Sequence, residues 1–207
     1  MLLDDDALSA LWTISDQGGP RPEFLIPVLY LESGFDPTIQ NRAGLPYFGI
    51  AQTNDKHLAA LGTTPAAFLA MSQGNQIRLA VAPYFRNVVS TYGPIRSATR
   101  AYQANFEPAS LARARLLSQI VEPSGSASYR ANAAALDPLR HGAITVSDLA
   151  LVMARAVHAG PSQQAIARAY ALRPTEKLVE PIYGHDFTDP LLTAAALALA
   201  AVAASLR

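Results

Sequence analysis

The sequence predicts an all-α fold, and three observations support that prediction. Apolar residues recur at helical spacing in nearly every segment, alanine is abundant, and no segment has a convincing strand pattern. Half of the 207 residues are apolar and only 15% are charged, which favours a sizeable core over disorder. The length fits one domain, or one domain with an appendage.

The first half of the chain divides into helices at glycine and proline. We expect a helix over residues 4–15, ended by the Gly18-Gly19-Pro20 turn. A second helix begins at Pro22, a residue suited to a first turn, and ends at Gly34. Its apolar run, 24–31, is dense enough for a buried strand, but Glu23 in the first turn favours a helix.

After a loop over 41–52 that leads into a short helix, three further helices are expected before the middle of the chain. One begins at Thr64-Pro65, with Thr64 as its cap, and a long amphipathic one covers 75–91. Another covers 95–105. The polar, breaker-rich segment 122–126 is the best boundary, and it divides the chain into a domain over 1–122 and an accessory helical region over 123–207.

The accessory region is predicted to contain helices over 129–136, over 147–158 and from Pro161 onward. Its last part, 190–207, is an alanine-rich apolar helix, shorter than the ~20 residues that a membrane span requires. Burial or packing in an oligomer is the main interpretation of this helix. Contact with a membrane is the alternative.

The segment 137–148 has the rhythm of an EF-hand loop, with Asp137 first, Gly142 sixth and Asp148 twelfth. Leu139 and His141 stand where oxygen ligands would be needed, so the loop is degenerate and is interpreted as a turn between helices. The four histidines show no metal-ligand spacing (57, 141, 158 and 185). We therefore expect neither a metal nor a cofactor.

Charge and cysteine content exclude several classes of function. Sixteen basic and sixteen acidic residues cancel, so the sequence gives no sign of a nucleic-acid partner. The absence of cysteine excludes disulfide and thiolate chemistry. The acidic start, Met1 to Asp6, lacks the basic residues of a secretory signal peptide.

Glu32 is the best candidate for a catalytic residue. It follows an apolar helical run and precedes Ser33 and Gly34, at the negative end of the helix dipole. Partial burial there disfavours the charged carboxylate and raises its pKa, as a general acid for glycosidic bond cleavage requires. The alternative is a solvated glutamate at a helix end.

Four sequence blocks together are similar to the lysozyme-like soluble lytic transglycosylase family, over roughly residues 20–121. The blocks are Glu32-Ser33-Gly34-Phe35-Asp36-Pro37, Asn41-Arg42-Ala43-Gly44, Gly49-Ile50-Ala51-Gln52 and Ala101-Tyr102-Gln103-Ala104-Asn105. The resemblance implies a lysozyme-like all-α fold with a cleft that binds peptidoglycan glycan strands.

The resemblance also implies roles for individual residues. Glu32 resembles the single acid/base, and Ser33 the hydroxyl that orients it or the sugar. Gln52 and Tyr102 resemble residues that contact the sugar. Gln103 and Asn105 stand where the family pattern has an asparagine and a glycine, and Ala51 stands where it has a methionine. Gln103 and Asn105 are expected in the sugar subsites.

The implied reaction cleaves the β-1,4 bond between N-acetylmuramic acid and N-acetylglucosamine and leaves a 1,6-anhydro end. A hydrolytic lysozyme is one alternative, with Asp36, Asp55 or Glu107 as a second carboxylate. A structural virion protein with an inactive lysozyme-like fold is another. We expect delivery to the cell wall by a phage particle or a secretion machine, whose proteins would contact residues 123–207.

Overall fold

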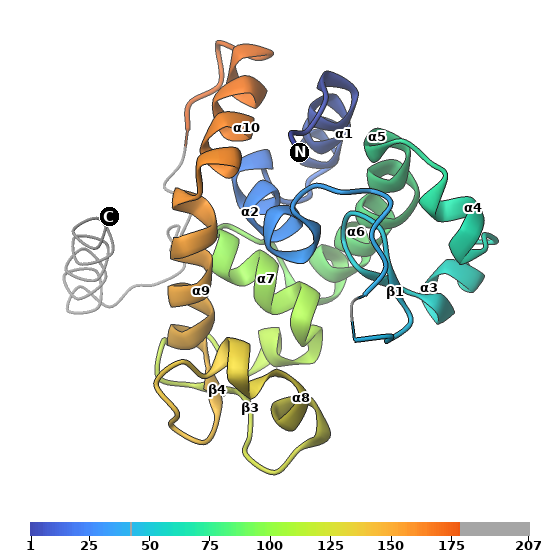
Figure 1. The fold of residues 1–207 in the computed structure, drawn as a ribbon. Helices are drawn as coiled ribbons and strands as arrows, with labels where there is room; N and C mark the ends of the chain where they lie inside the picture. Colours follow the sequence, from blue (N-terminus) through green and yellow to red (C-terminus); the bar gives the residue numbers. More distant parts are fainter. Residues whose placement is uncertain (42, 179–207) are drawn as a thin grey trace.

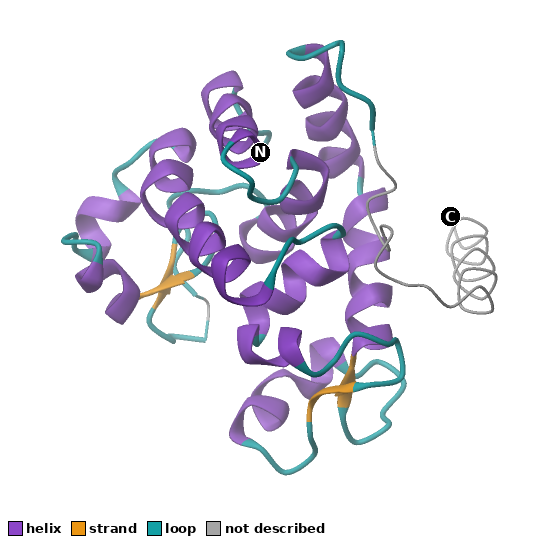
Figure 2. Cartoon of the chain, turned by 180° about the vertical axis from the view of Figure 1, so that it is seen from behind, coloured by secondary structure: helices purple, strands orange, loops and turns teal. Residues whose placement is uncertain are grey.

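The computed structural model describes residues 1–41 and 43–178, and most of this part of the chain is helical, which confirms the all-α class (Figures 1 and 2). The predicted alanine-rich helix over 190–207 lies outside the described residues. The long helices are α1 (Asp5–Asp16), α2 (Pro22–Ser33), α6 (Ala82–Tyr92), α7 (Ala98–Phe106), α8 (Ala127–Leu136), α9 (Val146–His158) and α10 (Gly160–Ala171). The short ones are α3 (Asp55–Ala60), α4 (Pro65–Leu69), α5 (Gln73–Gln76) and the 3-10 helix η2 (Pro108–Ala112).

The helix starts follow local capping chemistry. The Asp4 carboxylate accepts a hydrogen bond from the backbone N–H of Ala7 at the start of α1, and Thr64 caps α4 in the same way. Pro22 occupies the first turn of α2. Thr145 and Asp148 form a capping box at the start of α9. These starts agree with the boundaries expected from the sequence.

Two short antiparallel sheets of two strands each, of which the first is a hairpin, are an addition to the all-helical prediction. Strand β1 (Tyr47–Phe48) pairs with β2 (Thr53–Asn54), and β3 (Ile120–Glu122) pairs with β4 (Ile144–Thr145). Strands of two or three residues are too short to show an alternating pattern, so they cannot be predicted from periodicity.

The single helix predicted over 75–91 is wrong in one respect. A π-helical segment, η1 (Ile77–Val81), separates α5 from α6, and Pro83 lies in the first turn of α6. Proline has no N–H to donate, and its ring clashes with the carbonyl four residues earlier. The helix therefore widens locally to a π-helical turn before Pro83 and then continues as α6. The helix predicted over 95–105 begins later, at Ala98, because the Ser97 hydroxyl caps it.

The main hydrophobic core continues across the predicted boundary at residue 122. Helix α9 packs against both α2 and α7, and α10 packs against α1 and α2 (Figure 1). Phe85 and Tyr102 before the boundary and Met153 and Ala165 after it belong to one buried cluster. The division into two regions stays a prediction, but the described parts of both regions share this core.

A smaller cluster lies beneath the first hairpin. It contains Phe48, Leu58, Phe68 and Ala80, and it joins β1 to α3, α4 and η1. In Figure 1 β1, α3 and α4 lie to the right of α7, and α8 with β3 and β4 lies below it. Among the described helices, none has both the length and the apolar character to cross a membrane.

Candidate active site

Glu32 lies in the last turn of α2. Gly34 ends the helix in a left-handed conformation (φ 62°), and its N–H donates to the carbonyl of Tyr30 at 2.8 Å. The sequence therefore places this carboxyl group at the carboxyl end of a buried apolar helix, as expected.

Ser33 fixes the backbone around Glu32. Its hydroxyl lies 2.8 Å from the carbonyl oxygen of Ile50 and 3.0 Å from that of Leu29, and it accepts the N–H of Phe35. These contacts join the end of α2 to the Gly49-Ile50-Ala51-Gln52 block. Ser33 does not line the larger cavity described next, so its observed role is to position the Glu32 backbone.

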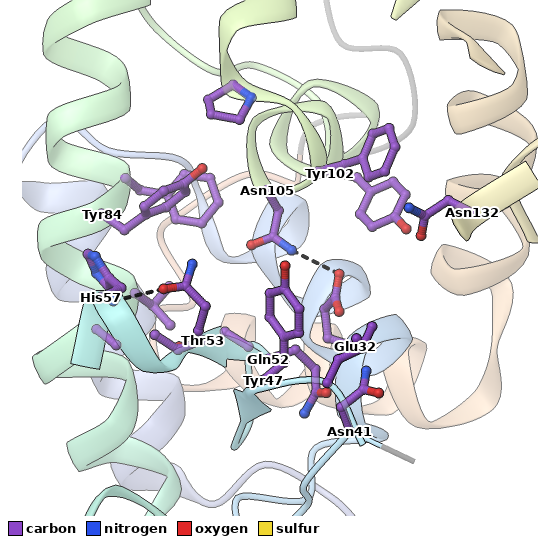
Figure 3. Close-up of a pocket in the computed structure, with 18 of the residues that line it drawn as sticks. Glu32, Asn41, Tyr47, Gln52, Thr53, His57, Tyr84, Tyr102, Asn105 and Asn132 are labelled. Carbon is purple, nitrogen blue, oxygen red and sulfur yellow. Dashed lines mark hydrogen bonds between the residues drawn. The ribbon is translucent and has the colours of Figure 1, made fainter. Parts of the chain in front are cut away.

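Glu32 faces a cavity of about 630 Å³ (Figure 3). This volume is in the usual range for ligand-binding clefts. Its walls come from α2, the first hairpin, α3, η1, α6, α7 and α8. The polar and aromatic side chains that line it include Glu32, Asn41, Tyr47, Gln52, Thr53, Asn54, His57, Tyr84, Tyr102, Asn105, Phe106, Ser128 and Asn132.

A second hollow of about 560 Å³ lies on another side of Glu32 and shares Glu32, Asn41 and Gln52 with the first. Ser33, Ile39 and Gln40 also line it. The carboxyl group therefore lies where two depressions meet, and a ligand longer than one ring can extend to both sides of it.

The environment of Glu32 favours its protonated form. Burial raises the pKa of this carboxyl to about 7, although the side-chain amide of Asn105 opposes the shift by donating a 2.8 Å hydrogen bond to Oε1 (Figure 3). Because Oε1 accepts this bond, Oε2 is the oxygen that can carry the proton. A carboxyl group with a pKa near neutrality can both give and accept a proton.

Two tyrosines in the cavity wall remain neutral. Tyr102 is 7% exposed, and burial together with the negative charge of Glu32 raises its pKa well above the ordinary value. Burial raises the pKa of Tyr84 to about 12, and its hydroxyl donates to the carbonyl oxygen of Ala104. The tyrosine wall therefore offers ring surface and hydroxyl groups without charge.

Gln52 lines both hollows, and its contact with a sugar stays a prediction. Its backbone has a positive φ of 49°, and its Nε2 donates to the carbonyl of Gly49 at 3.1 Å. This conformation turns the side chain back over its own loop, at the position where the two hollows meet.

Gln103 lies outside the cavity. It is completely buried, it accepts a hydrogen bond from Arg100, and it donates to Ser110 and to the carbonyl of Ala114. The expected sugar contact is not available to this side chain, because α7 turns it away from the face that carries Tyr102 and Asn105. It joins α7 to the segment that follows it.

Glu32 is the only carboxylate among the described residues that line the larger cavity, and none of these lining residues is lysine or arginine. Asp36, Asp55 and Glu107 all lie outside its lining. The Asp36 carboxylate accepts hydrogen bonds from the backbone and hydroxyl of Thr38, which lower its pKa. The described walls thus favour an uncharged ligand and provide one acid.

Several of the lining residues are not predictable from the sequence. Tyr47 lies in a two-residue strand, His57 has no metal-ligand spacing to the other histidines, and Asn132 lies in the accessory region. Each comes from a segment distant in sequence from Glu32, so only the tertiary fold brings them together. Helical spacing was a usable signal for Asn105, which lies three residues after Tyr102 and shares its face.

The degenerate loop 137–148 keeps much of the frame of an EF-hand. Ligand-type atoms of Asp137, His141 and Asp148 lie within 4.8 Å of one another, and Gly142 has φ 83°. The Nδ1 atom of His141 is 3.5 Å from Asp137 and 3.6 Å from Asp148. The imidazole of His141 thus lies beside both buried carboxylates. The spacing of the histidines in the sequence did not predict that these three side chains lie together. That no metal binds here stays a prediction.

Comparison of the chain with protein-family models, with curated proteins and with solved structures finds no match.

Proposed function

We propose that this protein is a peptidoglycan lytic transglycosylase that uses Glu32 as its single acid/base. The observation that carries the proposal is the position of one carboxyl group with a pKa of about 7 where two hollows meet. No other carboxylate of the described residues lines the larger hollow, which disfavours a two-carboxylate hydrolase. The lysozyme-like fold implied by the sequence blocks is part of this proposal.

In the first step, Oε2 of Glu32 donates its proton to the oxygen of the β-1,4 glycosidic bond. The bond between that oxygen and the anomeric carbon of N-acetylmuramic acid breaks, and positive charge develops on the sugar ring. In the second step, the Glu32 carboxylate takes the proton of the muramyl 6-hydroxyl, whose oxygen bonds to the anomeric carbon. Glu32 is protonated again, and no water is consumed.

The surrounding residues support both steps. Asn105 holds Oε1 through its 2.8 Å hydrogen bond and stabilises the carboxylate formed after the first step. Tyr102, Tyr47 and Gln52 provide neutral ring surface and hydrogen-bonding groups for sugar units. The sugars of a peptidoglycan strand are uncharged where their lactyl carboxyl groups are in amide linkage to peptide, and the described lining contains no lysine or arginine for an anionic ligand.

The proposed setting is the bacterial cell wall, reached with a phage particle or through a secretion machine. Proteins of that particle or machine are the proposed partners of residues 123–207. Contact of the 190–207 segment with a membrane is the alternative proposed earlier for that segment.

The test is digestion of purified peptidoglycan by the wild-type chain and by Glu32→Gln. We expect wild type to release muropeptides with 1,6-anhydro ends, lighter by one water than hydrated ends in mass spectrometry, and Glu32→Gln to release none. Hydrated ends alone would identify a hydrolase. A folded wild-type chain with no activity on any peptidoglycan would favour the structural virion protein.

A further inference from the structure

Helix α8 follows the predicted boundary at residue 122, yet it forms one wall of the larger cavity. Ser128, Ala131 and Asn132 all line that cavity. Residues separated by three and four positions share one face of a helix, so α8 presents a continuous strip of side chains to the ligand space.

Helix α8 is capped by local hydrogen bonds and anchored in the main core. At its start, the Ser126 hydroxyl accepts the N–H of Tyr129 at 2.8 Å. The Tyr129 hydroxyl donates to the buried carboxylate of Asp137, which follows the helix, at 2.9 Å, and Asp137 also accepts the N–H groups of His141 and Gly142. Leu136, the last residue of α8, is buried in the main hydrophobic cluster.

The strip carries hydrogen-bonding groups that the described residues do not satisfy. Nδ2 of Asn132 donates to the carbonyl of Ser128 at 2.9 Å, and within the described chain nothing donates to its Oδ1. Nor does the Ser128 hydroxyl have a hydrogen-bond partner there. Figure 3 shows Asn132 beside Tyr102, away from His57 across the cavity. An acceptor and a hydroxyl beside a tyrosine ring match the hydroxyl and acetamido N–H groups of an N-acetylated sugar.

We propose that Ser128 and Asn132 of α8 form a subsite for an N-acetylated sugar unit of the glycan strand, distinct from the two units joined at the cleaved bond. This subsite rests on the proposed function and extends it to the region after residue 122. Oδ1 of Asn132 accepts a hydrogen bond from the sugar, and the Tyr102 side of the cavity contacts the ring.

The first experiment measures binding without cleavage. The full chain with Glu32→Gln is titrated with peptide-free glycan strands prepared from peptidoglycan, whose freed lactyl carboxyl groups are converted to neutral amides, with and without Asn132→Ala. We expect Asn132→Ala to weaken binding by about three- to tenfold, as the loss of one hydrogen bond implies. Asn87→Ala is the matched control, because Asn87 is exposed on α6 and does not line the cavity.

The second experiment fills the subsite. Ala131→Trp places a large ring in the cavity, whereas Ala134→Trp adds the same ring at an exposed position of α8 outside the lining. We expect Ala131→Trp to weaken binding of long strands by at least about tenfold and Ala134→Trp to leave it unchanged. Circular dichroism and the Tm of each variant check that the fold is kept.

Three results would overturn the inference. If Glu32→Gln binds strands and both Asn132→Ala and Ala131→Trp bind as tightly as their controls, the α8 subsite is wrong while the proposed function stands. If Asn132→Ala weakens binding only of strands that carry peptides, the subsite accepts a peptide stem and not a sugar. If wild type cuts no peptidoglycan and Glu32→Gln binds no strand, the proposed function fails and the subsite fails with it.

Discussion

The side-chain amide of Asn105 donates a 2.8 Å hydrogen bond to Oε1 of Glu32, across a separation of 73 residues. This bond stabilises the carboxylate, whereas burial favours the neutral acid, and the balance leaves the pKa of Glu32 at about 7. The two opposing effects can be separated by mutation.

Removing the donor should raise the pKa of Glu32 further. In Asn105→Ala we expect the alkaline limb of the pH–activity profile to move to higher pH by about 1–2 units, since a hydrogen bond to a charged group is worth about 1.5–3 kcal/mol and one pKa unit corresponds to about 1.4 kcal/mol. In the proposed mechanism we also expect kcat to fall, because the carboxylate formed in the first step loses the donor that stabilises it. Asn87→Ala is the control, and an unchanged profile in Asn105→Ala would contradict the role given to this bond.

Activity itself should depend on pH through Glu32. The acid must be protonated to give its proton to the glycosidic oxygen, so kcat/KM should decline above about pH 7, approaching tenfold per pH unit. The measurement is muropeptide release under substrate-limiting conditions from pH 5 to 9. A profile that is flat through this range would mean that the protonation of Glu32 does not limit the reaction.

The same raised pKa predicts a change in stability. The folded state binds the proton of Glu32 more tightly than the unfolded state does, so its contribution to stability is complete below the ordinary pKa of 4.5 and is lost as pH rises through about 7. Glu32→Gln carries no charge to bury, and we expect it to be more stable than wild type by about 1–3 kcal/mol near pH 9. The difference should vanish at about pH 3, well below the ordinary pKa of 4.5, where the wild-type carboxyl is also neutral in both states. Urea unfolding at the two pH values measures it, and an equal difference at both would contradict the assignment.

Gln52 and Gln103 should respond to mutation in opposite ways. Gln103→Ala removes the buried hydrogen bonds that this amide makes with Arg100, Ser110 and the carbonyl of Ala114, and we expect a loss of about 1–3 kcal/mol in the free energy of unfolding. Gln52→Ala removes a side chain that lines both hollows, and we expect KM to rise with little change in Tm. A rise in KM for Gln103→Ala with unchanged stability would contradict this structural role and would indicate that Gln103 contacts the substrate.

The loop 137–148 should not respond to calcium in the wild-type chain. Leu139 and His141 occupy two positions that need oxygen ligands, although Asp137 and Asp148 are in place. We expect millimolar CaCl₂ to leave the wild-type Tm unchanged and to raise the Tm of the double variant Leu139→Asp/His141→Asp, reversibly with a chelator. A calcium-dependent Tm in wild type would show that the native loop holds the ion.

Much of the fold could be predicted from local signals. Helix starts at Asp4, Pro22, Thr64 and Thr145 depend on capping and first-turn chemistry that a few adjacent residues determine. The π-helical segment before Pro83 was missed, because its pattern of apolar residues is close to that of an α-helix.

The site was predictable only where it depends on local structure. Glu32 follows from a helix end, and the common face of Tyr102 and Asn105 follows from their spacing of three residues. Helical spacing also predicts that Gln103 lies on a different face of α7 from Tyr102 and Asn105, and therefore outside the cavity. The sugar contact expected for Gln103 depended on the family resemblance alone. The α8 wall was not predictable, because no local pattern indicates that Asn132 lies across a cavity from residues a hundred positions earlier.

The core shared by α2, α7 and α9 has a consequence for evolution and for engineering. A chain ended at residue 122 would expose to water the faces of α2 and α7 that α9 covers, and α2 carries Glu32 at its end. The helices after residue 122 therefore cannot be exchanged or deleted as a detachable module. The part of the chain that carries Glu32 and the described helices after residue 122 are expected to be inherited together, with substitutions in one compensated in the other.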